Sequence, residues 1–278
     1  MFICPICQSS LHLSERRYSC INRHSFDIAK EGYVNLLPVQ HKNSKAPGDN
    51  PQMMQARRQF LDSGAYQPLS DQVNQLMGTL PVQRVLDLGC GEGYYTGRLE
   101  QCLSQLKKPQ LNSRDLEITG IDIAKNAVRI SAKRYPNINF AVASAYQLPL
   151  EAAYFDAILR IYAPSLNTEL QRVIKPAGYL LTVTPGPRHL IEMKQAVYQE
   201  VKLHQDAIKI EEGFSHQQRQ QLSYELDTTA GQLLDQLLQM VPLAWKFTGD
   251  SRQQFVHNTP KVTIDFLIDV YQRNTLTS

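Results

Sequence analysis

Three cysteines and one histidine near the N-terminus have the spacing of a metal site. They form the pattern C-x₂-C-x₁₂-C-x₃-H, with Cys4, Cys7, Cys20 and His24 as the ligands. Zinc prefers thiolate sulfur and imidazole nitrogen, and four protein ligands close its tetrahedral shell. We therefore expect a structural zinc, because no open position remains for a reacting group. His12 and His41 are alternative ligands, although the spacing favours His24.

A second group of residues has the chemistry of a nucleoside-binding turn. An apolar run ends in VLDLG and leads into CGEGYYTG, which gives the pattern Asp87-x-Gly89-x-Gly91-x-Gly93. Glycines at a strand-to-helix turn let the backbone approach a ligand that lies on the helix N-terminus. A dinucleotide fingerprint is excluded, because residues 94–96 are not glycine where its last glycine is required.

The acidic residues around this turn favour S-adenosylmethionine as its ligand. The D-x-G-x-G-x-G pattern resembles the first motif of class I methyltransferases, and Asp122 ends the next apolar run, where a carboxylate can accept both ribose hydroxyls. In ASAYQLPL, Ser144 occupies a position that is usually acidic, so we expect backbone groups and Ala145 to contact the adenine. Cys90 and Cys102 are interpreted as packing residues.

Alternating apolar runs and helical patterns must position these residues. Strands are predicted at 82–89, 116–122, 137–144, 155–162 and 178–185, with helices at 94–106 and 125–135. This alternation predicts a parallel sheet with helices on both faces. A further helix at 230–240 and a strand at 261–272 are expected, the strand closing the sheet as an antiparallel edge.

The chain divides into three parts on this interpretation. Residues 1–34 have too few large apolar side chains to bury a core, so a metal must hold them. Residues 35–65 carry prolines and a glycine and are interpreted as a connector with a helix at 53–61. Residues 66–278 form the α/β body, and the zinc-binding part is expected to be separable from it.

Composition limits the classes of protein that fit. The chain has 278 residues, 42% of them hydrophobic, which is ample for a core. No apolar run approaches the about 20 residues that cross a bilayer, and no signal peptide is recognisable, so we expect a cytoplasmic protein without a membrane partner. Five cysteines, three of them in the first twenty residues, exclude a disulfide framework.

The net charge of +3 is too small to indicate a nucleic-acid partner by itself. Through residue 60, however, eight basic residues stand against four acidic ones, an excess of +4. This excess fits either an RNA-contacting segment or an ordinary solvated surface.

The combination of a zinc head with such a body resembles one family, the bacterial 23S ribosomal RNA guanine-N1 methyltransferases (RlmA family). The resemblance covers nearly the whole length and is carried by long segments, which include HSFDIAKEGYVNLLPVQHK, MMQARRQFLDSGAYQPL, LDLGCGEGYYT, RIYAP and TPGPRHL. It implies a class I (Rossmann-like) methyltransferase fold with a small N-terminal zinc-binding domain. It also implies methyl transfer from S-adenosylmethionine to N1 of a guanine in a 23S rRNA hairpin.

The resemblance also assigns residues. It implies zinc ligation by the four N-terminal ligands, and cofactor contacts by Tyr66, Gly91, Glu92 and His189. The expected partner is 23S rRNA, and a homodimer is an open alternative to a monomer. These cofactor contacts add to Asp87, Gly89, Gly93 and Asp122, which the motif itself indicates.

Substrate-facing residues are expected at the end of the fourth strand, in RIYAP. Arg160 and Tyr162 are candidates for holding or stacking the base. Guanine N1 carries a proton at neutral pH, so a base must remove it, but the sequence does not identify that base. Because N1 lies on the pairing edge, the target must be unpaired or extruded.

Three alternatives remain open at this point. One is the branch of the same family that confers macrolide resistance by methylating a neighbouring guanine, although AKEGYVNLLPVQHK favours the housekeeping branch. The second is a small-molecule methyltransferase, for which the zinc head has no obvious use. The third is a zinc-ribbon RNA-binding protein with an inactive body, which the intact glycine motif disfavours.

Overall fold

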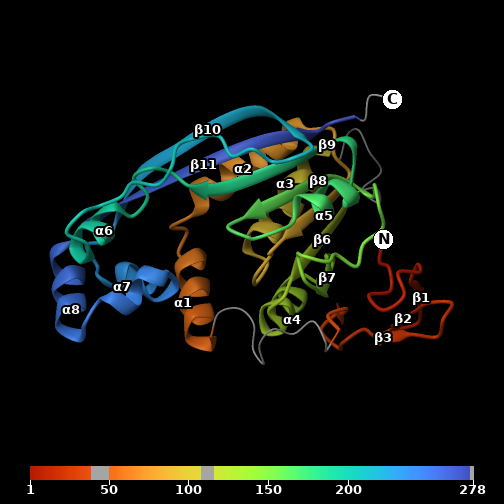
Figure 1. Cartoon of the computed structure of the whole chain (residues 1–278). Helices are drawn as coiled ribbons and strands as arrows, with labels where there is room; N and C mark the ends of the chain where they lie inside the picture. Colours follow the sequence, from red (N-terminus) through yellow and green to blue (C-terminus); the bar gives the residue numbers. More distant parts are fainter. Residues whose placement is uncertain (39–49, 108–115, 276–278) are drawn as a thin grey trace.

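The structure is a computed structural model that describes residues 1–38, 50–107 and 116–275. Within these ranges, a small N-terminal sheet adjoins a larger sheet flanked by helices (Figure 1). The small sheet is antiparallel and comprises β1 (His12–Ser14), β2 (Arg17–Ser19) and β3 (Ser25–Asp27). These short strands have few apolar residues of their own, as the sequence indicates.

The large sheet has the strand order β10-β11-β9-β8-β5-β6-β7-β4. Neighbours from β9 to β4 pair in parallel, whereas β11 is antiparallel to both β9 and β10. The strands are β4 (Tyr33–Asn35), β5 (Arg84–Leu88), β6 (Glu117–Asp122), β7 (Asn139–Val142), β8 (Phe155–Ile161), β9 (Ile174–Pro185), β10 (Phe214–Asp227) and β11 (Lys261–Arg273). The five predicted parallel strands are confirmed.

Helices follow most strands of this sheet. They are α1 (Pro51–Asp62), α2 (Gln67–Thr79), α3 (Tyr94–Lys107), α4 (Lys125–Arg134), α5 (Asn167–Val173), α6 (Ile191–Val197), α7 (Gln232–Met240) and α8 (Gly249–Asn258), with the 3₁₀ turn η2 at Pro242–Lys246. Helix α1 has a defined start, because Asn50 Oδ1 accepts a hydrogen bond from Met53 N at 2.9 Å and Pro51 follows the cap. In the part of the chain described, no helix is both long enough and apolar enough to cross a membrane.

The two faces of the parallel strands are covered differently. Along β5 and β8, alternate side chains enter two separate hydrophobic clusters, as the two-residue period of a strand requires. Helices α2, α3 and α4 cover one face. The other face is covered by α5 together with the zinc head, through Phe2, Cys4 and Leu11. The expectation of helices on both faces therefore needs refining, since the head replaces part of a helical layer.

The contacts between head and body are close and specific. Phe2 is 3% exposed and pairs with Leu150 in an isolated β-bridge, and Ile3 N donates to Pro149 O at 3.0 Å. The Met1 ammonium lies 3.1 Å from the Glu151 carboxylate. This packing is evidence against the expectation that the head is independent of the body, because removing the head would expose the sheet.

Of the two strands in the long hairpin, β11 was predicted from the sequence and β10 was not. Strand β11 is antiparallel to β9, as expected, but it is not the edge strand, because β10 lies outside it. The sequence of β10, FSHQQRQQLSYELD, is mostly polar, and most of its residues are at least partly exposed. Such a strand lacks the apolar run by which the others were found.

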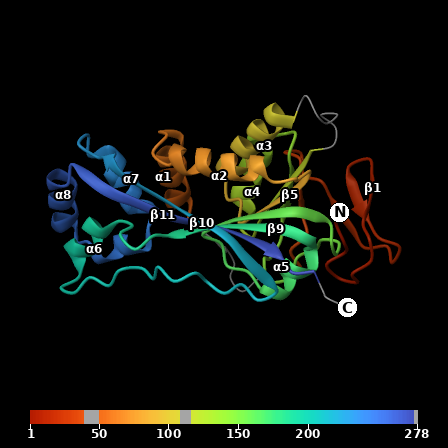
Figure 2. The same ribbon diagram turned by 90° about the horizontal axis from the view of Figure 1, so that it is seen from above.

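The two views give the overall shape. The β10–β11 hairpin arches from the sheet toward a cluster of α6, α7 and α8, and α1 lies beneath the arch (Figure 1). The head and α8 lie at opposite ends of the molecule in both views (Figures 1 and 2).

Candidate functional site

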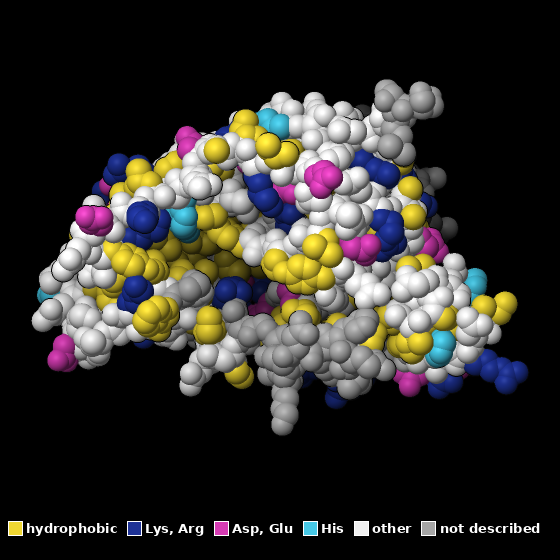
Figure 3. All heavy atoms as spheres, in the orientation of Figure 1, with side chains coloured by type: hydrophobic (Ala, Val, Ile, Leu, Met, Phe, Trp, Pro, Cys, Tyr) yellow, Lys and Arg dark blue, Asp and Glu magenta, His cyan; other side chains and the backbone are white. Residues whose placement is uncertain are grey.

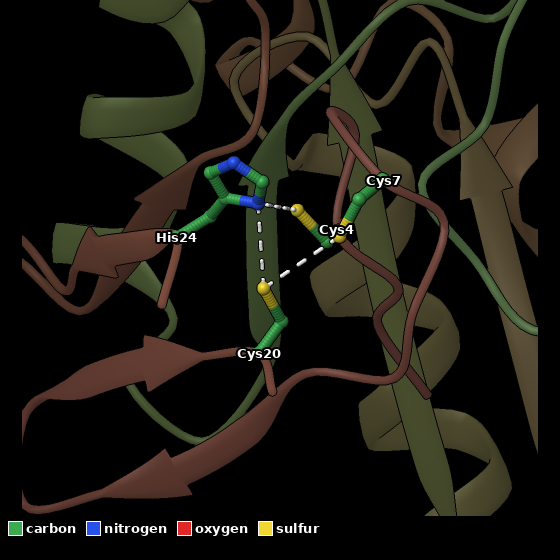
Figure 4. Close-up of side chains that lie close together, drawn as sticks. All are labelled: Cys4, Cys7, Cys20 and His24. Carbon is green, nitrogen blue, oxygen red and sulfur yellow. Dashed lines mark hydrogen bonds between the residues drawn. The ribbon is translucent and has the colours of Figure 1, made fainter. Parts of the chain in front are cut away.

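The four predicted zinc ligands lie together in the head (Figure 4). Their ligand atoms are all within 4.8 Å of one another. His24 Nδ1 lies 3.5 Å from Cys4 Sγ and 3.4 Å from Cys20 Sγ, and the sulfurs of Cys7 and Cys20 are 3.7 Å apart. Tetrahedral zinc bonds of about 2.3 Å to sulfur and about 2.0–2.1 Å to nitrogen separate ligand atoms by about 3.6–3.8 Å. The donor set and its spacing therefore fit zinc, with Nδ1 as the histidine donor.

Local backbone structure produces this arrangement. One turn is closed by Gln8 N donating to Cys4 O at 2.8 Å, and the other by Cys20 N donating to His24 O at 3.0 Å. The Ser9 hydroxyl, 3.1 Å from the sulfur of Cys7, lowers the pKa of that thiol to about 5. Cys7 is therefore in the thiolate form that zinc binds. Among the described residues His12 is not part of the cluster, and His41 lies outside them.

A cavity of about 1270 Å³ lies at the carboxyl ends of the parallel strands. Its walls include the ends of β5, β6, β7, β8 and β9, which is where α/β sheets bind ligands. It is lined by most of the predicted cofactor residues, namely Tyr66, Asp87, Gly89, Gly91, Glu92, Asp122 and His189. Gly93, just before α3, is not among the described lining residues, and a Cβ atom built on it would lie 2.8 Å from that of Ser131 on α4.

The glycine turn is held by the end of β6. Gly89 N and Cys90 N both donate to Ile121 O, at 2.8 and 3.0 Å, and Gly91 N donates to Asp122 Oδ2 at 3.0 Å. Gly91 has a φ of +54°, and a Cβ atom built on it meets no atom within 4 Å. Because Gly91 lines the cavity, a side chain at this position would occupy open space there.

The Asp122 carboxylate is oriented by two backbone amides. Besides Gly91 N, it accepts from Ala124 N, which lies 2.7 Å from Oδ1. It stands at the end of β6 and lines the cavity, as Ser144 and Ala145 do beyond β7. These positions fit a ribose on Asp122 and an adenine beside residues 144–145.

Asp87 is buried behind the glycine turn. It is 2% exposed, and its Oδ2 accepts a hydrogen bond from the Thr96 hydroxyl at 2.5 Å. Burial raises the pKa of Asp87 to about 7, with a smaller contribution from the negative charge of Asp122. The carboxyl is thus close to half protonated at neutral pH.

An ion pair holds helix α1 against the side of the cavity that carries the glycine turn. Arg58 donates two hydrogen bonds to the Glu92 carboxylate, at 2.6 and 2.7 Å, which is the bidentate geometry that makes such pairs strong. Tyr66, at the start of α2, is buried edge-on between Phe60 and Phe266, with ring centroids 4.8 and 5.0 Å away. Burial raises the pKa of Tyr66, so its hydroxyl stays protonated.

His189 lies on the opposite wall, after β9. It is 8% exposed, and its Nδ1 lies 3.2 Å from Asp265 N, which donates to it. Burial lowers the pKa of His189 to about 4, so the ring is neutral at physiological pH. In the neutral ring, accepting at Nδ1 places the hydrogen on Nε2. His189 can therefore donate one hydrogen bond from Nε2.

The two substrate candidates from RIYAP occupy different environments. Tyr162 lines the cavity, is half exposed and has a φ of +54°, and its ring lies 6.4 Å from that of His189. Arg160 is 6% exposed and is not among the described lining residues. Its guanidinium forms an ion pair with Glu211 and a 2.8 Å hydrogen bond to Ser165 Oγ. In this structure Arg160 supports the loop, whereas Tyr162 faces the ligand space.

Arg58 and Asp265 were not predicted as site residues from the sequence. Arg58 was counted only as surface charge, and its helical position facing Glu92 depends on how α1 packs. Asp265 is 1% exposed in β11, and its carboxylate accepts from Arg188 N at 2.9 Å and Gln221 Nε2 at 2.8 Å. A charged residue inside the apolar run VTIDFLIDV was the available indication that it has a buried partner.

Two family models match the chain. A model described as "RlmA, N-terminal" matches residues 2–45, and one described as "Methyltransferase domain" matches residues 81–239. The chain is 31% identical over 270 residues to the 23S rRNA (guanine(748)-N(1))-methyltransferase of Streptomyces fradiae, which covers 93% of this chain and 91% of the relative.

Other proteins have similar sequences or folds. YxjB of Bacillus subtilis (strain 168) is 30% identical over 263 residues, covering 90% of this chain and 89% of YxjB. Among solved structures, the YcgJ protein of Bacillus subtilis is 17% identical with a TM-score of 0.45, covering 73% of this chain and 98% of YcgJ.

The zinc cluster gives a first prediction. Cys7→Ser is expected to release the metal and to lower the free energy of unfolding of the whole chain by about 3 kcal/mol or more, because the head that buries Phe2 loses its fold. Metal analysis and denaturant unfolding measure both effects. The control is Cys102→Ser, a cysteine on α3 outside the cluster. Loss of zinc without any change in the body's unfolding would contradict the packing argument.

The cofactor wall gives a second prediction. Asp122→Ala is expected to weaken S-adenosylmethionine binding by about 1.5–3 kcal/mol, the cost of losing hydrogen bonds to a charged acceptor. Gly91→Val is expected to weaken it further, because the side chain enters the cavity. Calorimetry with Asp227→Ala as control, an exposed aspartate on β10, tests both. Unchanged affinity in both variants would remove the glycine turn from the cofactor site.

The buried Asp87 gives a third prediction, on pH dependence. Its pKa is raised in the folded state, so the native protein holds a proton from about pH 4 to about pH 7 that the unfolded chain releases. The stability of the wild type is therefore expected to fall across this interval relative to Asp87→Asn. Between pH 5 and pH 8 the difference should grow by about 2.5 kcal/mol.

Unfolding of the cofactor-free protein at both pH values measures this difference. Asp71→Asn, at an exposed aspartate, is the control substitution. A difference that is constant with pH would show that Asp87 is ionised throughout.

Proposed function

We propose that this chain transfers a methyl group from S-adenosylmethionine to N1 of one guanine in a hairpin of 23S rRNA. The chain belongs to the family of 23S rRNA guanine-N1 methyltransferases. The observation that carries the proposal is one cavity of about 1270 Å³ that joins the glycine turn to Tyr162 and His189. Small-molecule sites typically occupy about 300–1,000 Å³. This cavity therefore leaves room for a nucleobase beside the cofactor.

The residues at the turn would hold the cofactor. We assign the ribose to Asp122, the backbone approach to Gly89 and Gly91, and further contacts to Tyr66, Asp87, Glu92 and His189. Gly93 supports the turn from behind, where a Cβ atom would lie 2.8 Å from that of Ser131. The zinc is assigned to Cys4, Cys7, Cys20 and His24.

The proposed chemistry is an in-line displacement. S-adenosylmethionine supplies an activated methyl group on its sulfonium, so the protein mainly aligns the nucleophile and excludes water. Tyr162, half exposed in the cavity, is placed to contact the face of the base. The neutral His189 is placed to donate from Nε2 to an acceptor on the base or cofactor. The Arg58–Glu92 pair holds α1 over the cofactor side of the cavity.

The three-part organisation is also retained as a proposal, with residues 1–34 as the RNA-recognition module, 35–65 as the connector and 66–278 as the catalytic body. The connector also contributes to the core of the body, because Leu36, Leu37 and Phe60 are buried in its hydrophobic clusters. We also propose a cytoplasmic location, because ribosomal RNA, the proposed substrate, is found there. Arg160 remains a candidate only for an indirect role, through the loop that it supports.

The proposal predicts one modified position in 23S rRNA. An N1 methyl group blocks base pairing, so primer extension should stop at a single guanine only when both enzyme and S-adenosylmethionine are present. Gly91→Val should abolish the stop, and the exposed Asp227→Ala should retain it. The position of the stop distinguishes the housekeeping branch from the macrolide-resistance branch. Methylation of free nucleotides or metabolites, with no stop on the RNA, would contradict the proposal.

A further inference from the structure

Lys194 on α6 is a buried lysine that lines the cavity. It is 9% exposed, and no hydrogen bond or ion pair involves its side chain within the described ranges 1–38, 50–107 and 116–275. Burial without a compensating anion lowers the pKa of its ammonium group. Lysine is almost never buried unless it is paired, because an uncompensated charge is costly to remove from water. The missing partner of this ammonium group is therefore expected to be an anion from a ligand.

The surroundings of Lys194 do not supply that anion. Burial lowers the pKa of both His189 and His204, and the positive charge of Lys194 lowers both further, so neither imidazole supplies a negative charge. The carboxylate of Asp265 already accepts from Arg188 N and Gln221 Nε2. Glu200 is exposed on this rim and forms no ion pair in the described part of the chain. This end of the cavity thus has space for a negative group.

An exposed aromatic group adjoins the same end. Tyr198 follows α6 one turn after Lys194 and lines the cavity. The ammonium of Lys246 lies 4.0 Å from the centroid of the Tyr198 ring and 5.1 Å from that of Trp245. Trp245, in η2, is 78% exposed. An exposed tryptophan beside a cation is a platform on which an unpaired base stacks.

Figure 3 shows this region as a hollow lined by hydrophobic side chains, with lysine, arginine and histidine side chains around it. Cations near the hollow include Lys194, Lys202 and Lys246. We propose that the α6–η2 end of the cavity is a subsite for a nucleotide next to the target guanosine. This proposal rests on the proposed function. Lys194 binds a backbone phosphate of that RNA, and Trp245 stacks on an adjoining unpaired base.

The position of the subsite favours RNA over the cofactor as the source of the anion. Helix α6 follows β9, which is two strands from β5 and three from β6 in the sheet. At about 4.8 Å per strand, these ends are about 10 and 14 Å from the β9 end. The cofactor residues Gly91 and Asp122 follow β5 and β6. The carboxylate of S-adenosylmethionine is therefore the less suitable partner for Lys194.

The test uses the full-length, zinc-loaded protein and a transcript of the 23S rRNA hairpin that the wild type methylates. Lys194→Gln is expected to raise KM for this RNA about tenfold with little change in kcat. The slope of log binding constant against log salt should become shallower by about 0.7–0.9, the amount for one lost phosphate contact. Lys133→Gln, at an exposed lysine on α4 outside the cavity lining, is the matched control.

Two further readouts separate function from a structural role. Lys194→Gln removes an unpaired buried charge, so the free protein should be as stable as the wild type or more stable. Trp245→Ala should weaken RNA binding about tenfold without altering the salt slope, and Trp245→Phe should retain most of the affinity. Ile210→Ala, at an apolar side chain that is 89% exposed, is its control.

Several outcomes would overturn the inference. A loss of S-adenosylmethionine affinity in Lys194→Gln would assign the anion to the cofactor's carboxylate. A change in oligomeric mass in Trp245→Ala would make η2 an interface between two copies of the chain. RNA binding equal to the wild type in both variants would remove the subsite. In each case the wild type still methylates the RNA, whereas an inactive wild type would contradict the proposed function itself.

Discussion

The structure depends on covering the second face of a parallel sheet whose strands are apolar on both sides. Helices α2, α3 and α4 cover one face, but α5 alone cannot cover the other, and Phe2, Cys4 and Leu11 complete it. Those residues belong to the head, which has only three short strands and cannot fold without a metal. Zinc therefore acts beyond the head. By fixing the two ligand turns, it holds the layer that shields Leu86, Leu88 and Ile121, which lie in the strands that lead to the glycine turn and to Asp122.

The cavity in turn depends on polar contacts between strand ends. Ile121 O and the Asp122 carboxylate hold the glycine turn, and Asp265 in β11 holds the loop that carries His189. Two walls of one cavity are thus positioned by residues almost 150 positions apart in the chain. Strand β11 can reach this loop because it pairs with β9 at Phe266 and Pro185. The long hairpin therefore supports the site, although none of its residues is among those that line the cavity in the described part of the chain.

Patterns that act over short distances made much of this predictable. The zinc ligands lie within twenty-one residues, and the buried strands are continuous apolar runs, so spacing and hydropathy were sufficient for both. Features set by distant packing were not predictable in the same way. The polar β10 has no apolar run, and Arg160 looks like a substrate contact until Glu211, fifty-one residues away, takes its charge. The burial of Lys194 could not be predicted either, because it depends on the residues that pack around α6 and not on the sequence of the helix.

The basic excess of the first sixty residues has a different meaning in the folded chain. Arg17 pairs with Asp27, Arg58 pairs with Glu92 inside the cavity wall, and Arg57 contacts the Met240 carbonyl at 3.5 Å. Arginines committed in this way release fewer counterions on binding RNA than a count of charges suggests. By contrast, Lys202 and Lys246 form no ion pair in the described part of the chain. They lie near α6 and η2, at the opposite end of the molecule from the head (Figures 1 and 2). If the proposed function holds and the head binds the RNA hairpin, the hairpin would extend along the cavity to meet these cations. The strand ends would then lie beneath its middle, where an extruded base would enter.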